Sequence, residues 1–450
     1  MSKLSRITLN LCVILVGVVL ATGSAHAQKD EREERDKQKT KQAQAVSKEV
    51  YDKIVKAQEQ VDAKDYQGAL RALNSLYNPD KLTEYEQANV LNYIGFIYYN
   101  MDDIQNAIRT YERMIAIPSL EPQMGKQTTY TLAQLYTMEE QYQQALNTLD
   151  KWFILEPNPA PDPFILKAQN LYQLSRYKEM IEPIENAMRV ARSRNKPVKE
   201  DWYVLLNFAY FQDENYTMVR DIQKILLQTW PKKRYWFSLA GAYTELGEDN
   251  NLIASYGAAH DQGMLEKDSE LVTMAQLYMQ AEVPYKAATL LEKEMAGGRV
   301  PKEAKNYRLL SQAFMLAQED ERAVPALKEA ARLSDDGELD VRLGNTHLNL
   351  GNYDECIAAV RTGLRKAGLK SPDNAQISLG MCLYNKRQYN DAIAAFRAAS
   401  KTQRSRKISQ QWIRVIQADI ERNRQIRLAR EAADKKRKEV EQRRRQADRV

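Results

Sequence analysis

The sequence has few of the residues that usually build a catalytic or metal site. It contains three histidines and three cysteines in 450 residues. No GxxxxGK[ST] phosphate loop, HExxH zinc motif, GxSxG nucleophile motif or CxxC pair occurs along the chain. His260 and His347 lie too far apart in sequence to suggest one metal site. We therefore expect no catalytic residue, no metal ion and no cofactor, and a protein that is not an enzyme.

Long hydrophobic runs are also scarce, since only one occurs, from Leu9 to Leu20. A chain with a single run of this kind is not a polytopic membrane protein. Lys3 and Arg6 precede the run, and the small residues of Ala25-His26-Ala27 follow it. This order is typical of a secretory signal peptide, residues 1–27, cleaved near Ala27. The alternative is one N-terminal membrane anchor. Cleavage predicts an exported protein, located in the periplasm.

Glycine and proline are present at 17 and 14 residues, and no segment repeats them periodically. With 44% hydrophobic and 28% charged residues, this composition excludes collagenous, low-complexity and wholly disordered chains. Tyrosine is abundant instead, with 25 residues against 8 phenylalanines and 5 tryptophans. The tyrosines recur in a fixed setting, which points to an internal repeat.

The repeat is marked by a small or polar residue that returns every 33 to 39 positions. The markers are Ala57, Gly95, Ala133, Ala168, Asn207, Ala240, Ala275, Ser311, Gly344 and Gly380. The residue twelve positions later is alanine in six repeats and Cys356 in a seventh. Small residues at two facing positions let two helices approach closely, and the spacing matches a helix-turn-helix repeat of ~34 residues.

At these residues the chain resembles tetratricopeptide repeat (TPR) proteins, over about ten repeats from residue 50 to residue 401. The repeats marked by Gly344 and Gly380 match well, whereas Met180 and Val219 replace the usual alanine in repeats four and five. The resemblance implies an all-α solenoid, a right-handed superhelix whose concave face is lined by the first helix of each repeat.

The resemblance also implies which side chains face a partner in that groove. They are side-chain amides and aromatic rings on the first helices of repeats two to five: Asn89, Asn92, Phe96, Tyr99, Tyr130, Gln134, Gln169, Tyr172, Phe208 and Phe211. Amides pair with an extended peptide backbone, and aromatic rings supply rigid contact area. The alternative is that these rings only pack between neighbouring helices. The lysine and asparagine clamp of some TPR proteins for a terminal carboxylate is missing here.

The two ends of the chain are strongly charged. Residues 28–49 begin with a dense mixed-charge run and are predicted to be a disordered leader. Residues 401–450 hold 17 basic and 7 acidic residues, whereas residues 28–400 hold 47 and 53. Within residues 402–428, Trp412, Val415, Ile416 and Ile420 are predicted to form one stripe of a helix that caps the last repeat.

Residues 429–450 are predicted to form a basic helix or tail. Its basic side chains are Arg430, Lys435, Lys436, Arg437, Lys438, Arg443, Arg444 and Arg445. One interpretation is a solvated helix stabilised by pairs of opposite charges spaced four apart. The other is an arm that meets an anionic membrane surface or an acidic partner. Nucleic acid is excluded as a partner if the protein is exported.

Two cysteines, Cys356 and Cys382, remain after the signal peptide. They belong to consecutive repeats, so they can be neighbours. Both a disulfide, which an oxidising compartment allows, and two buried free thiols fit the sequence.

As a whole, an exported all-TPR chain with a basic end is similar to the periplasmic TPR proteins that accompany TonB–ExbB–ExbD energy-transduction systems. That resemblance implies a non-enzymatic scaffold or adaptor that binds TonB, ExbB or ExbD components and supports TonB-dependent transport. The alternative function is a cell-envelope assembly factor for outer-membrane proteins or for peptidoglycan synthesis.

Overall fold

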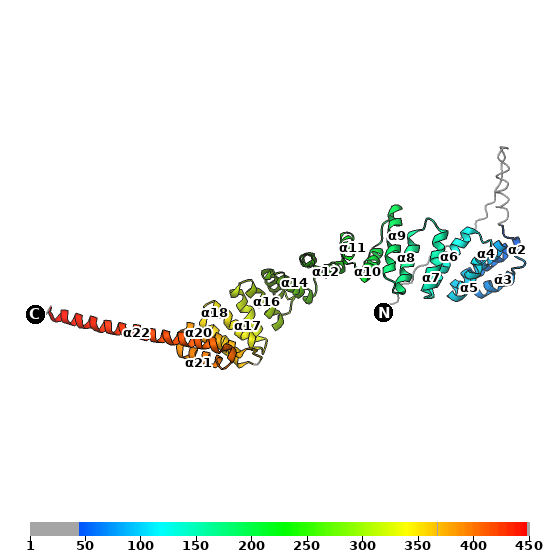
Figure 1. Cartoon of the computed structure of the whole chain (residues 1–450). Helices are drawn as coiled ribbons and strands as arrows, with labels where there is room; N and C mark the ends of the chain where they lie inside the picture. The colour runs from blue at the N-terminus through cyan, green and yellow to red at the C-terminus, as the bar shows by residue number, and fades with distance from the viewer. Residues whose placement is uncertain (1–44, 367, 448–450) are drawn as a thin grey trace. The chain divides into compact units, whose positions relative to one another are not determined.

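The computed structural model describes residues 45–366 and 368–447, and every regular element within them is helical. The predicted signal peptide and most of the predicted leader lie outside the described residues. The first described helix begins at Lys48. The all-α fold and its helix-turn-helix repeats are therefore confirmed. The repeats form two compact units that divide between Trp230 and Pro231, and each unit is described by itself (Figure 1).

Unit 1 contains five helical hairpins, in which an even-numbered first helix is followed by an odd-numbered second helix. They are α2 (Lys48–Asp62) and α3 (Tyr66–Leu76), α4 (Glu84–Asn100) and α5 (Ile104–Ile115), α6 (Pro122–Met138) and α7 (Tyr142–Leu155), α8 (Pro161–Gln173) and α9 (Ile181–Ser193), α10 (Glu200–Gln212) and α11 (Tyr216–Thr229). A short 3₁₀ turn, η1 (Lys178–Met180), precedes α9.

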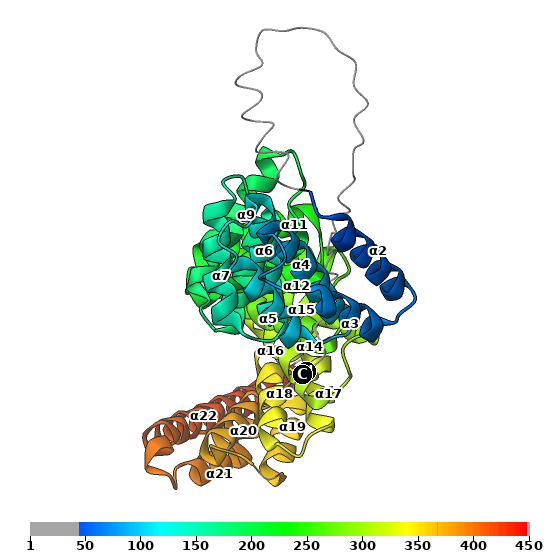
Figure 2. The same ribbon diagram turned by 90° about the vertical axis from the view of Figure 1, so that its right-hand side faces the viewer.

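Unit 2 contains five further hairpins and one long helix (Figures 1 and 2). They are α12 (Lys233–Glu245) and α13 (Asp249–Asp261), α14 (Asp268–Gln280) and α15 (Pro284–Ala296), α16 (Ala304–Leu316) and α17 (Asp320–Arg332), α18 (Gly337–Asn349) and α19 (Tyr353–Arg365), α20 (Pro372–Asn385) and α21 (Tyr389–Ala399), then α22 (Gln403–Ala447). The ten markers found in the sequence each lie on the first helix of a hairpin.

Each hairpin turns at one residue with a left-handed backbone, seven positions after the marker. The ten residues are Lys64, Asp102, Glu140, Ser175, Glu214, Gly247, Glu282, Gln318, Gly351 and Arg387. The N–H of the next residue then bonds back to a carbonyl in the last turn of the first helix, as from Asp103 to Tyr98 (3.0 Å). This is the hydrogen bond of a Schellman motif, which ends a helix sharply.

Close contact between the two helices explains the small markers. A Cβ atom added to Gly95 would lie 2.7 Å from the ring of Tyr111, and one added to Gly380 would lie 2.7 Å from the ring of Phe396. At Gly344 it would lie 2.4 Å from Val360. In each case the blocking side chain stands sixteen residues after the marker, on the second helix. A bulkier marker would force the hairpin apart.

The tyrosine three residues after the marker connects consecutive repeats. The hydroxyl of Tyr136 donates to Glu112 of the preceding second helix (2.6 Å), and the hydroxyl of Tyr210 donates to Glu185 in the same way (2.7 Å). Both rings are buried. Burial, with the acceptor carboxylate, raises the pKa of Tyr210 to about 12. Phenylalanine would fill the same space but would leave the carboxylate without this donor.

The carboxylate of Glu86 stabilises the start of unit 1 through hydrogen bonds. This glutamate is 5% exposed, and its carboxylate accepts from the backbone N–H of Ser47 (2.8 Å) and of Thr83 (2.9 Å). Burial opposes the charged form, but these hydrogen bonds prevail and lower the pKa of Glu86 to about 2. A single carboxylate therefore accepts hydrogen bonds from the backbone N–H groups of the N-cap residues of both α2 and α4.

The sequence predicts two segments here, residues 402–428 and residues 429–450. In the described structure a single helix, α22, runs across the boundary between them. Its first part packs on α20 and α21, where Ile416 is fully buried and Trp412 stacks on Phe396 with ring centroids 5.7 Å apart. Asp373 on α20 accepts from Arg404 in the first turn of α22 (2.9 Å) and from Thr402, which directly precedes that helix (3.0 Å).

The prediction for Val415 is wrong, because this side chain is 46% exposed and lies outside the capping contact. At about 100° per residue, the packed side chains Trp412, Ile413, Ile416 and Ile420 span one arc of the helix, and Val415 falls roughly 60° outside that arc.

The structure joins Cys356 on α19 to Cys382 on α20 as a disulfide. Their Cα atoms are 6.1 Å apart, within the range that a disulfide spans. Both residues are fully buried in the core of the last two repeats. The bond therefore links two successive hairpins.

Candidate partner-binding surface

The predicted side chains of repeat two are half-buried, and one of them is bonded within its own helix. The side chain of Asn89 donates to the backbone carbonyl of Tyr85 (2.8 Å), whereas Asn92 takes part through its backbone carbonyl, which accepts from the Tyr111 hydroxyl (3.5 Å). Phe96 and Tyr99 are half-buried. All four residues therefore expose part of their surface, and their role in binding stays a prediction.

In repeat three, Tyr130 serves mainly to pack the repeat. Its ring lies 5.0 Å from the ring of Trp152 on α7, and it borders the buried cluster around Leu149. Burial, and to a lesser degree Asp162, raises the pKa of Tyr130 to about 12. Gln134 is half-buried beside it. For Tyr130 the packing interpretation left open by the sequence is the better one.

Repeats four and five present aromatic rings to solvent. Tyr172 on α8 is 41% exposed and Phe211 on α10 is 49% exposed. Phe208 lies between these repeats, with its ring 5.3 Å from that of Tyr172 and 5.1 Å from that of Tyr177. The set is completed by Tyr216, whose ring lies 5.9 Å from that of Phe211. We call these five residues the aromatic patch.

The sequence predicted three members of the aromatic patch and missed two. Tyr177 and Tyr216 lie at the start of second helices, outside the positions from which we read the predicted surface. The sequence pattern could have identified both, because each stands nine residues after its marker, a position at which several repeats carry tyrosine. Gln169, also predicted, is exposed on α8. A polar pair missed by the sequence joins α6 to α8, where Asn170 donates to the Thr137 hydroxyl (2.9 Å).

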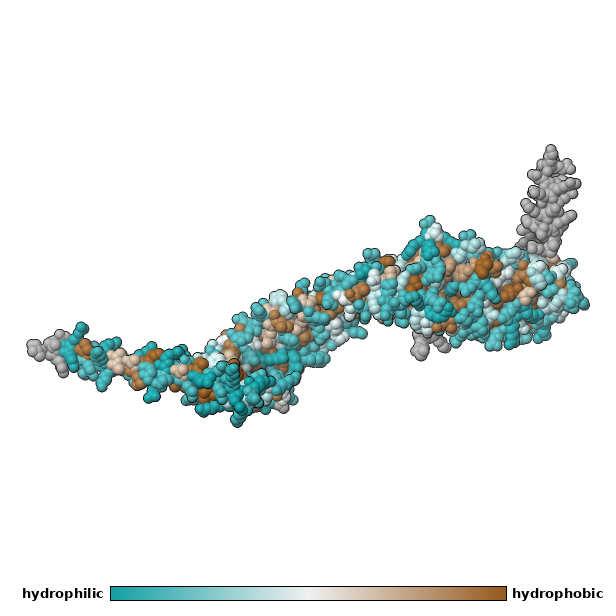
Figure 3. Space-filling view, in the orientation of Figure 1, coloured by the Kyte–Doolittle hydropathy of each residue, from teal (hydrophilic) through white to brown (hydrophobic). Residues whose placement is uncertain are grey.

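The basic tail residues lie on the outer part of α22. The side chains of residues 421–444 are all exposed, including seven of the eight predicted basic residues. The eighth, Arg445, falls on the helix but outside the described side chains. Figure 3 shows this part of the helix as mostly hydrophilic, with separate hydrophobic spots.

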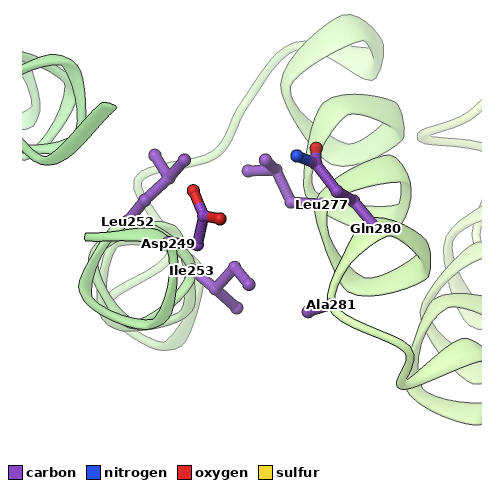
Figure 4. Close-up of a pocket in the computed structure, with 6 residues that line it drawn as sticks. All are labelled: Asp249, Leu252, Ile253, Leu277, Gln280 and Ala281. Carbon is purple, nitrogen blue, oxygen red and sulfur yellow. The ribbon is translucent and has the colours of Figure 1, made fainter. Parts of the chain in front are cut away.

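A small hollow lies between α13 and α14, but it does not suit a substrate. It has a volume of about 30 Å³ and is lined by Asp249, Leu252, Ile253, Leu277, Gln280 and Ala281 (Figure 4). Asp249 is its one titratable residue, so it lacks the group of acids, bases and nucleophiles that chemistry requires. Among the described residues there is no set of three metal-binding side chains. No helix in the described ranges has both the length and the hydropathy to span a bilayer.

Comparison with known families supports the repeat fold. Residues 341–405 match the family described as "Tetratricopeptide repeat", and residues 100–187 match "Anaphase-promoting complex, cyclosome, subunit 3". With ten helix-turn-helix hairpins in the described residues, the fold is that of a TPR solenoid, a class built for protein–protein interaction. No curated protein sequence matches the chain.

Solved structures with a similar arrangement of helices share little sequence with this chain. A tetratricopeptide repeat protein from Parabacteroides merdae is 17% identical, with 64% of this chain and 94% of that chain covered and a TM-score of 0.34. YrrB, described as a TPR protein with an unusual peptide-binding site, is 16% identical, with 42% and 95% covered and a TM-score of 0.35. MamA is 19% identical, with 38% and 90% covered and a TM-score of 0.33.

Proposed function

We propose that this protein is a non-enzymatic, exported scaffold that binds a polypeptide partner over the aromatic patch of repeats four and five. The observation that carries the proposal is the exposure of Tyr172 and Phe211 next to rings that are already held in place. Fixed aromatic rings at the surface lose little conformational entropy on binding, and aromatic residues dominate the energy of most protein interfaces.

The periplasm is the proposed location, supported by the signal-peptide pattern of residues 1–27. The proposed partners are components of a TonB–ExbB–ExbD system, supported by the resemblance of the whole chain, so the function would be to assist TonB-dependent transport. The mass of the purified mature protein tests export, since cleavage after Ala27 leaves Gln28 as the first residue. A cytoplasmic protein that retains Met1 would overturn this part of the proposal.

Site-specific crosslinking in living cells tests the partner. A photoreactive amino acid at Phe211 should capture tagged TonB or ExbD. The same group at Arg189, which is exposed on the second helix of repeat four, should capture neither. Phe211→Ala with Tyr172→Ala should weaken the isolated interaction by more than about tenfold, because interface aromatics each contribute on the order of 2 kcal/mol.

Deletion of the gene distinguishes a role in TonB-dependent transport from a role in cell-envelope assembly. Slow growth under iron limitation, with normal porin levels, supports a role in TonB-dependent transport. Normal iron-limited growth with loss of porins or altered cell shape would replace it with envelope assembly. Capture of a different protein at Phe211 would keep the aromatic patch as the binding surface and reject TonB and ExbD.

A further inference from the structure

The outer part of α22 is a helix that no other part of the described chain covers. All residues from Glu421 to Arg444 are exposed. At 1.5 Å per residue they form a rod of about 36 Å. Figure 1 shows this rod continuing beyond α20 and α21 in unit 2. Residues 421–444 contain ten basic and five acidic residues, so the rod is positively charged overall.

The charges of this rod are divided between two sides. At the helical spacing of three and four residues, one side carries Ile426, Ala429, Ala433 and Val440 in a row. Arg430, Lys436, Arg437, Arg443 and Arg444 lie along or beside that row. We call these nine residues the basic face. The acidic residues Glu431, Asp434, Glu439 and Glu441 fall on the remaining surface of the helix.

Ion pairs within the helix neutralise the other side only. Arg424 pairs with Glu421 and Arg427 pairs with Glu431, each with 3.7 Å between the charged atoms. In the described part of the chain, no ion pair is formed by the five cations of the basic face. Their charge is therefore available to a ligand.

We propose that the basic face binds an acidic amphipathic helix of a partner protein, side by side. Ile426, Ala433 and Val440 repeat every seven residues, which is the spacing of one position of a coiled-coil seam. The second seam position holds Ala429, Lys436 and Arg443, so the seam itself is part apolar and part basic. The alanines are small enough to let a second helix approach closely, and the cations in and beside the seam then meet the carboxylates of that helix.

The same residues argue against other occupants. Two copies of the chain would bring like charges together, which is unfavourable at a helix pair. A membrane-bound helix needs large apolar side chains on its buried face, and here the row is mostly alanine and valine with a single isoleucine. Leu428, the one leucine of the rod, lies on a different side of the helix.

The test uses the full mature protein and a defined probe. The probe is a fluorescent peptide of about 28 residues with leucine and alanine along a heptad seam and glutamate on both flanks, a charge pattern that prevents self-pairing. We expect the peptide to bind the wild-type protein, and Lys436→Gln with Arg443→Gln to weaken binding about tenfold. The matched control, Lys435→Gln with Lys438→Gln on the other side, should change binding by less than about twofold.

Several results would overturn the proposal. Equal weakening by both double variants would show unspecific attraction to a charged rod. Failure of the peptide to bind would leave α22 as a solvated helix. Selective loss of binding to vesicles containing phosphatidylglycerol, without peptide binding, would assign the basic face to a membrane. Circular dichroism confirms that each variant keeps its helix, and Phe211→Ala should bind the peptide normally, since the aromatic patch is a separate surface.

Discussion

A left-handed residue in each turn shows how the repeat constrains single positions. All ten first helices end at this conformation, yet only Gly247 and Gly351 are glycines there. A residue with a Cβ atom pays on the order of 1 kcal/mol in this region, whereas glycine does not. The hairpin geometry therefore imposes strain at eight other turns, and the packing of each hairpin offsets it.

Replacing one of these turn residues by glycine should stabilise the protein. Gln318 is uncharged and exposed, with φ of 61°. We expect Gln318→Gly to raise the free energy of unfolding of unit 2 by about 0.5–1 kcal/mol, after the greater entropy of glycine in the unfolded chain is subtracted. Urea unfolding measures the change. Gly351→Ala, where φ is 78°, is the control and should destabilise by a similar amount.

Glu86 gives unit 1 a defined dependence on pH. Its folded pKa of about 2 is below the ordinary 4.5, so the stabilisation is complete above pH 4.5 and is lost as the pH falls toward 2. Glu86→Gln should lower the free energy of unfolding of unit 1 by about 2 kcal/mol at pH 7. The difference from wild type should shrink steadily between pH 4.5 and 2.

Urea unfolding of unit 1 at several pH values provides the measurement for Glu86. Glu59→Gln, on the exposed side of α2, is the control and should leave the profile unchanged. A difference between Glu86→Gln and wild type that stays constant down to pH 2 would show that the carboxylate does not act through its charge.

At the scale of elements, α22 combines two parts with different roles. Its first part covers the apolar side of the last hairpin through Trp412, Ile416 and Ile420. The hydroxyl of Tyr384 on α20 adds a hydrogen bond to Asp419 (2.7 Å), one residue before Ile420. Beyond this point the side chain of Asn423 still donates to the Tyr389 hydroxyl on α21 (3.4 Å). After Asn423 no tertiary hydrogen bond is seen among the described residues, and charge pairs within the helix stabilise it.

Truncation should separate these parts. A chain ending at Asn423 should unfold at the same temperature as the full chain, because it loses no buried side chain. A chain ending at Thr402 should melt earlier and aggregate, because it exposes the buried face of α20 and α21. Thermal melts with light scattering test both. Loss of stability in the longer truncation would show that the rod contributes to the core.

At the scale of the whole molecule, each of the two units is stabilised by a different kind of interaction. Unit 1 has the buried carboxylate of Glu86, and unit 2 has the disulfide that joins α19 to α20. Closing a loop of this size, with the cysteines 26 residues apart, stabilises by about 3 kcal/mol through the unfolded state. Each unit can therefore be perturbed separately.

Reduction should weaken unit 2 alone. Dithiothreitol should lower the unfolding midpoint of unit 2, and leave that of unit 1 in place. The Cys356→Ala, Cys382→Ala double variant should no longer respond to the reductant. Thiol titration of the denatured mature protein should find no free cysteine. Two free thiols in protein purified from an oxidising compartment would contradict the disulfide.

The sequence by itself determined the repeat, its period and the helix class. Small markers every 33 to 39 residues are set by contacts inside one hairpin, between residues such as Gly95 and Tyr111 that lie close in sequence. Local contacts of this kind leave a pattern that can be read directly. The cap formed by Trp412 and Ile416 was readable for the same reason.

Only the tertiary structure decided which candidate side chains remain free. Tyr130 and Tyr172 both belong to the predicted surface, yet the first packs against Trp152 of its own hairpin and the second is 41% exposed. Solvent exposure depends on which side chains the surrounding helices place beside each ring, and the repeat pattern does not encode these. The disulfide, the division into two units and the place of Val415 were settled in the same way, by packing between elements distant from each residue in the chain.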